Sequence, residues 1–79
     1  MVRVRLFAAL REAAGTAEVE VPPARLGEIL ADLEERYGER FATVLGYASV
    51  LVDGDRGDPA AQVPDGTEIA LLPPFSGGC

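Results

Sequence analysis

The chain has 79 residues, of which 48% are hydrophobic and 25% are charged, and its formal net charge is −6. This size allows one domain with one sheet and one or two helices, and its excess negative charge disfavours nucleic acid as a partner. The absence of histidine and the single cysteine exclude iron–sulfur ligation, CxxC redox chemistry and the commonest general base.

The N-terminal sequence MVRVRLFAAL contains no apolar run long enough for a signal peptide or a membrane span. We therefore expect a cytoplasmic protein with no membrane partner. The free thiol of the single cysteine fits a reducing compartment.

The first half of the chain predicts two strands and one long helix. Val2, Val4 and Leu6 alternate with Arg3, Arg5 and Phe7, and the valines of AEVEV at 17–21 alternate with glutamates. These two segments indicate an antiparallel pair of strands joined by a short helical turn in ALREAAGT. Pro22 and Pro23 then stop the second strand. The helix follows from a stripe with the spacing i, i+3, i+4, i+7 and i+11, made of Leu26, Ile29, Leu30, Leu33 and Tyr37. Gly38 stands where a helix ends.

The second half predicts a further helical turn and two or three strands. The turn is ERFATVLG, the strands are ASVLVD at 48–53 and TEIALL at 67–72, and DGDRGDP is a turn with one short edge pairing. If the first and last strands are neighbours, they must be parallel and joined through the helical crossover. The β-grasp arrangement of ubiquitin-like proteins satisfies this: an α+β fold whose mixed sheet of four to five strands carries one main helix on one face.

Acidic residues in the predicted body offer two weak candidates for a site. Asp53, Asp55 and Asp58 are spaced like oxygen ligands, but the EF-hand pattern with its final glutamate and flanking helices is missing, which favours a solvated turn. Glu34 and Glu35 are better explained as a soluble helix face than as a catalytic acid–base pair. We predict no metal site and no catalytic residues in the body.

The C-terminal sequence PPFSGGC is the most specific feature of the chain. Pro73 and Pro74 cannot continue sheet pairing and favour a stiff, extended path, whereas Gly77 and Gly78 fit a channel too narrow for side chains. Seven residues at roughly 3.3 Å each reach about 23 Å. We therefore divide the chain into a folded body, residues 1–72, and an extended flexible tail, residues 73–79.

Three segments, VRLFAALREAAGT, PDGTEIAL and LPPFSGG, resemble the ubiquitin-like sulfur carriers, the family of MoaD and ThiS. The resemblance covers the whole chain and is strongest for the small subunit of molybdopterin synthase. It implies that the Gly78 carboxylate is adenylated by an enzyme of the ubiquitin-activating type and converted to a thiocarboxylate by a sulfur donor. The chain would then be no enzyme and would bind no cofactor, while its activating partner uses ATP.

The resemblance also implies which residues meet the partners. Residues 73–78, that is Pro73, Pro74, Phe75, Ser76, Gly77 and Gly78, would enter a partner's active site. The acceptor would be an enzyme such as the large subunit of molybdopterin synthase or a cysteine synthase. If the first and last strands are adjacent, an apolar cluster near the tail would provide a docking patch, formed by Phe7, Leu51, Ala70 and Leu72.

Cys79 departs from the family pattern, because it locks the Gly78 carbonyl in an amide. The interpretation we favour is a precursor from which a zinc metalloprotease of the JAMM type removes Cys79. A carrier for cysteine synthesis ends its cycle with the same Gly–Cys amide, and thiamine and natural-product pathways remain open as recipients. The alternatives of another class are a ubiquitin-like modifier joined to target lysines and a β-grasp interaction module whose tail is inert.

Overall fold

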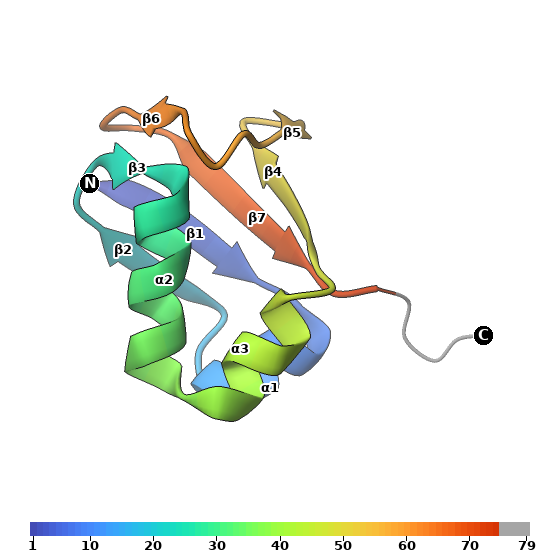
Figure 1. Cartoon of the computed structure of the whole chain (residues 1–79). Coiled ribbons are helices and arrows are strands. Elements are labelled where there is room, and N and C mark those ends of the chain that lie inside the picture. The colour runs from blue at the N-terminus through green and yellow to red at the C-terminus, as the bar shows by residue number, and fades with distance from the viewer. Residues whose placement is uncertain (75–79) are drawn as a thin grey trace.

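The computed structural model describes residues 1–74. Its centre is a five-stranded mixed sheet (Figure 1). In spatial order the strands are β2 (Glu18–Val21), β1 (Val2–Leu6), β7 (Glu68–Leu72), β4 (Ser49–Val52) and β5 (Asp55–Arg56).

The first and last strands of the chain lie side by side at the middle of this sheet. β1 and β7 run parallel with Val4 opposite Ile69, and every other neighbouring pair in the sheet is antiparallel. The predicted parallel pair and the β-grasp arrangement are therefore confirmed, and β7 is flanked on both sides by other strands.

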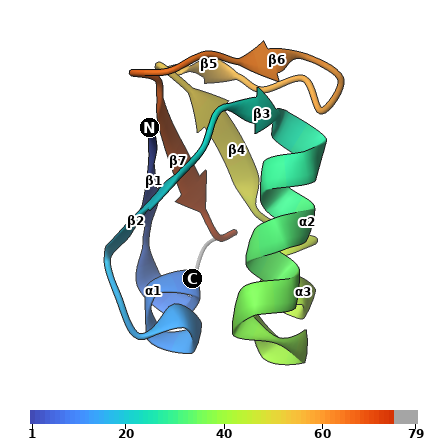
Figure 2. The same ribbon diagram turned by 90° about the vertical axis from the view of Figure 1, so that its left-hand side faces the viewer.

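Three helices accompany the sheet. They are α1 (Ala8–Ala14), α2 (Leu26–Tyr37) and α3 (Glu39–Leu45). α2 covers one face of the sheet, whereas α1 and α3 lie near the end at which β1 and β7 finish (Figure 2). Gly15 ends α1 with a φ of 77°, and Gly38 separates α2 from α3 with a φ of 94°. Both values fall in the positive-φ region that favours glycine, and the predicted end of the long helix at Gly38 is confirmed.

The core lies between the sheet and the helices. The alternation predicted for β1 is confirmed, and β7 shows the same pattern. The inward side chains of both strands are almost completely buried: Val2, Val4, Leu6, Ile69 and Leu71. Val19, Val50 and Val52 are only half-buried and pack at its margin. The short helices add side chains that the strand pattern did not predict, namely Leu10, Phe41 and Leu45.

A second, two-stranded sheet was missed by the sequence prediction. β3 (Ala24–Arg25) pairs antiparallel with β6 (Gln62–Val63) directly before α2 begins. The segment around β6 also caps the helix, because the Leu26 N–H donates to the Ala61 carbonyl at 3.0 Å and the Gly27 N–H to the Pro59 carbonyl at 2.9 Å. These contacts satisfy N–H groups that have no partner within the helix.

No helix within residues 1–74 combines the length and the apolar character that crossing a membrane requires.

Candidate functional site

The C-terminal segment leaves the body from the middle of the sheet. β7 ends at Leu72, opposite Ser49 of β4, and Pro73 and Pro74 follow outside any strand. Figure 1 shows this exit between the end of β1 and the start of β4. Pairing stops here because proline has no N–H to donate to a neighbouring strand.

The remaining predicted tail residues lie outside the described residues: Phe75, Ser76, Gly77, Gly78 and Cys79. Their predicted roles stay predictions. Of the predicted tail, the structure places only Pro73, which is half-buried, and Pro74, which is exposed.

The four residues predicted as a docking patch share the face of the sheet opposite α2, and we call them the outer-face patch. Ala70 is the centre of one row, with Arg5 opposite it on β1 and Leu51 opposite it on β4. Leu72 follows Ala70 on the same face, one residue before the exit. Because Leu6 pairs with Leu71, the next residue, Phe7, falls beside Leu72. All four patch residues are half-buried rather than fully exposed.

Phe7 is held by the turn from β1 into α1. Its backbone is still extended, with φ −123° and ψ 151°, at the position that caps the helix. The guanidinium carbon of Arg5 lies 5.5 Å from the centre of the Phe7 ring, and Arg5 Nη1 lies 3.5 Å from Glu68 Oε2. A cation over an aromatic face is attractive, so Arg5 and Glu68 form a charged border on the patch.

A shallow hollow continues the outer-face patch toward the β4–β5 turn. It is lined by Arg5, Leu51, Asp53, Gly54, Glu68 and Ala70. A shallow lining of mixed apolar and charged residues suits the side chains of another protein better than a small molecule, which needs a deep and enclosed site.

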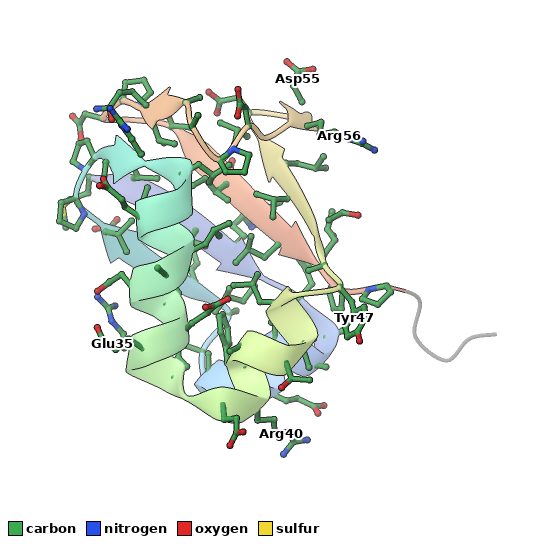
Figure 3. All side chains as sticks on the ribbon, in the orientation of Figure 1. Glu35, Arg40, Tyr47, Asp55 and Arg56 are labelled. Carbon is green, nitrogen blue, oxygen red and sulfur yellow. The ribbon has the colours of Figure 1, made fainter. Side chains whose placement is uncertain are left out.

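Tyr47 is a surface feature near the exit that the sequence analysis missed. Its side chain is 75% exposed, in the connection between α3 and β4. In Figure 3 it lies beside the end of β7. The sequence contains a usable signal: Tyr47 lies two residues before a strand that pairs antiparallel with β7, so it falls at the end of the sheet where the tail begins.

Two of the three aspartates considered as oxygen ligands accept hydrogen bonds from nearby backbone N–H groups. Asp53 Oδ1 accepts a hydrogen bond from the Glu68 N–H at 3.0 Å, and Asp58 Oδ1 accepts one from the Ala60 N–H at 3.0 Å. Within residues 1–74 no three histidine, cysteine or acidic side chains cluster as metal ligands would. A hydrogen bond and the charge of the N-terminal ammonium lower the pKa of the Asp65 carboxyl, at the other end of the sheet from the exit.

The outer-face patch thus forms a partly exposed apolar surface beside the point at which the chain leaves the sheet.

Comparison with solved structures finds proteins of the same size and fold. The small archaeal modifier protein SAMP1 from Haloferax volcanii is 31% identical, with a TM-score of 0.79 and 98% of both chains covered. A chain of the BexX/CysO complex from Amycolatopsis orientalis is 28% identical, with a TM-score of 0.80 and coverage of 99% of this chain and 100% of that one.

A third similar structure is a chain of the complex between subunits 1 and 2 of the molybdopterin-converting factor from Helicobacter pylori. It is 28% identical, with a TM-score of 0.72 and coverage of 98% of this chain and 97% of that one. No curated protein sequence matches the chain. The model of the ThiS family matches residues 4–78. The chain therefore belongs to the ThiS family of ubiquitin-like sulfur carriers.

Proposed function

We propose that Gly78 carries the sulfur. After removal of Cys79, the Gly78 carboxylate is adenylated by a ubiquitin-activating-type enzyme and then converted to a thiocarboxylate. In this proposal residues 1–72 form the body that partners recognise, and residues 73–79 form the tail that they act on.

One observation carries the proposal: the family match runs through the glycine pair and ends at Gly78. Cys79 is the only residue beyond it. The shared pattern thus includes the proposed acyl terminus and leaves out the residue that blocks it.

The chemistry explains why partners must act. A carboxylate is a poor electrophile, so its oxygen has to leave as part of AMP before sulfide can take its place. Attack of sulfide on the acyl-adenylate forms the carbon–sulfur bond and releases AMP. The thiocarboxylate then gives its sulfur to an acceptor enzyme and returns as the carboxylate. The chain contributes the carbon atom and its delivery, and ATP is bound by the activating enzyme.

Two of the similar structures suggest recipients for the sulfur. We favour molybdopterin synthesis, since the Helicobacter pylori complex pairs a similar chain with subunit 2 of a molybdopterin-converting factor. The CysO complex supports a carrier for cysteine or for another biosynthetic product as the alternative. In the first case the acceptor is a molybdopterin synthase large subunit, and in the second a cysteine synthase or related enzyme.

Cys79 requires its own step in this proposal. Hydrolysis of the Gly78–Cys79 amide by a metalloprotease of the JAMM type would free the carboxylate, and a metal-bound water suits an uncharged amide on an accessible chain end. Cysteine synthesis on the carrier would produce the same amide, so one protease would serve both cases.

Reconstitution tests the function directly. The full chain and a chain ending at Gly78 are incubated with the activating enzyme, ATP and sulfide, and their intact masses are measured. We expect only the shorter chain to gain about 16 Da, the exchange of oxygen for sulfur. A chain ending in Gly78→Ala serves as the control for the acyl terminus. The proposal fails if the Gly78 form never gains this mass.

A protein modifier is the second candidate function, favoured by the 31% identity to small archaeal modifier protein SAMP1. The same adenylate would then be attacked by a lysine amine of a target. The chain has no lysine and could not build chains on itself. High-mass conjugates in cells that disappear when Gly77 and Gly78 are deleted would support this function. If no such conjugates form but a thiocarboxylate is detected, the sulfur-carrier function is supported instead.

A further inference from the structure

Tyr47 is unusual among the large hydrophobic side chains of residues 1–74, of which only Met1 and Tyr47 are exposed. Met1 precedes β1, at the end of the sheet opposite the exit, because β1 and β7 run parallel. Single exposed hydrophobic residues are common and need no explanation by themselves. Tyr47 is of interest because of its position beside the chain exit.

Tyr47 lies on one side of the chain exit and Phe7 on the other. β4 is antiparallel to β7 with Ser49 opposite Leu72, so the turn that carries Tyr47, two residues before β4, lies at the end of the sheet where β7 finishes. Phe7 follows β1 on the other side of β7. Figure 3 shows Tyr47 at the end of β7, on the same side of the molecule as the exit. Two aromatic rings, from the two neighbours of β7, thus flank the start of the tail.

We infer that Tyr47 is a docking residue for the activating enzyme and packs against an apolar rim around the channel that receives the tail. The inference rests on the proposed function. It adds to the docking surface a residue outside the outer-face patch, on the other side of the chain exit.

The length of the tail supports this placement. Six residues, 73–78, span at most about 20 Å when fully extended. An enzyme that holds Gly78 in a buried active site must therefore bring its surface close to the exit. The aromatic side chains that it would meet there are Tyr47 and Phe7. Tyrosine buries much area with little loss of conformational freedom, and it is enriched among residues that dominate binding energy.

The expected kinetic signature follows from this geometry. In this inference Tyr47 contacts the enzyme outside the active site and contributes the same binding free energy to the bound complex and to the transition state. Its loss should raise the KM for the carrier and leave kcat unchanged, which is the pattern of lost uniform binding. A variant of Gly78, by contrast, should change kcat.

ATP–pyrophosphate exchange by the activating enzyme from the same genome measures both constants. The substrates are chains ending at Gly78 with Tyr47→Ala, Tyr47→Phe or Glu35→Ala. Glu35 is an exposed side chain on α2 and lies away from the exit in Figure 3, so it controls for general surface effects. We expect roughly tenfold higher KM for Tyr47→Ala, in the range of interface hot spots, and near wild-type values for the other two.

The outcomes separate this inference from the proposed function. If the chain ending at Gly78 without any substitution supports no exchange at all, the proposed function is wrong. If it supports exchange and Tyr47→Ala has the KM of Glu35→Ala, the docking role is wrong. Because Tyr47 is 75% exposed, Tyr47→Ala should keep its fold, and circular dichroism verifies this before the kinetics. Tyr47→Asp places a charge where an apolar contact is expected and should raise KM still further. An unchanged KM for this variant would also contradict the inference.

Discussion

Gly57 lies where the segment after β5 passes over the start of α2. An added Cβ at Gly57 would stand 2.6 Å from Leu26 Cδ2 and 3.1 Å from Val52 Cγ2. Leu26 is 1% exposed and cannot move aside easily. The absence of a side chain at Gly57 thus lets this segment approach the core.

Gly57→Ala should therefore destabilise the fold by about 1 to 3 kcal/mol, the usual penalty for overpacking. Gly46→Ala is the matched control, because Gly46 has an ordinary helical conformation with φ −60° and its nearest contact is at 3.4 Å. Urea unfolding of both variants measures the free energy. Equal stabilities for the two variants would show that the close approach at Gly57 is relieved without cost.

The ion pair between Asp65 and the N-terminal ammonium predicts how stability depends on pH. The hydrogen bond and the charge of the N-terminal ammonium lower the pKa of its carboxyl in the folded state. A group whose folded pKa lies below its unfolded value, about 3.9 for aspartate, stabilises the fold above that value. The contribution is lost as the pH falls through the folded pKa.

Asp65→Asn should thus lower stability at neutral pH, with a difference from the unaltered chain that vanishes in acid and shrinks in salt. Thermal unfolding across pH measures it. Because the pair is exposed, the effect should be small. A difference that grows as the pH falls would contradict this sign.

At the scale of elements, α2 shows how burial on one helix face controls stability. Leu33 is fully buried, whereas Leu30, three residues earlier on the same helix, is half-buried. Leu33→Ala should cost about 2 to 5 kcal/mol and Leu30→Ala about half of that or less. Denaturant unfolding of the pair provides the comparison. Similar losses would mean that the two leucines contribute equally to the core.

The two faces of β7 should separate folding from partner binding. Leu71 points into the core with 0% exposure, and Leu72 lies on the outer face beside the exit. Leu71→Asp should unfold the chain, because an unpaired charge would be buried. Leu72→Asp should leave the fold intact and weaken binding to the activating enzyme, and Phe7→Asp should do the same. Unchanged binding of both outer-face variants in calorimetry would rule out the patch as a docking surface.

The elements that the sequence predicted well are those with a sustained period. Alternation marks β1 and β7, and the apolar stripe marks α2, because each has one buried and one solvated face. β3 and β6 were missed since two residues show no period, and their pairing depends on a segment nearly forty positions away. The outer-face patch followed from strand order, whereas Tyr47 did not, because its place depends on the register of β4 against β7 rather than on any local pattern.

At the scale of the whole molecule, the β-grasp topology supports the proposal that partner enzymes carry out acyl chemistry on the tail. The central strand is also the last strand, so the tail starts from the most firmly held part of the sheet. The helices pack on one face and at one end, which leaves the other face beside the exit for partners. In this account the body fixes where the tail starts, and the partners supply the reaction.

The most direct test of the central claim is the intact mass of the protein recovered from its own cells. We predict that molecules have lost Cys79 and that a fraction is about 16 Da heavier than the Gly78 acid, as a terminal thiocarboxylate would be. Alkylation of that fraction with iodoacetamide, followed by fragmentation, should place the label on Gly78. If every molecule retained Cys79 and none carried the additional mass, the sulfur-carrying role of Gly78 would be contradicted.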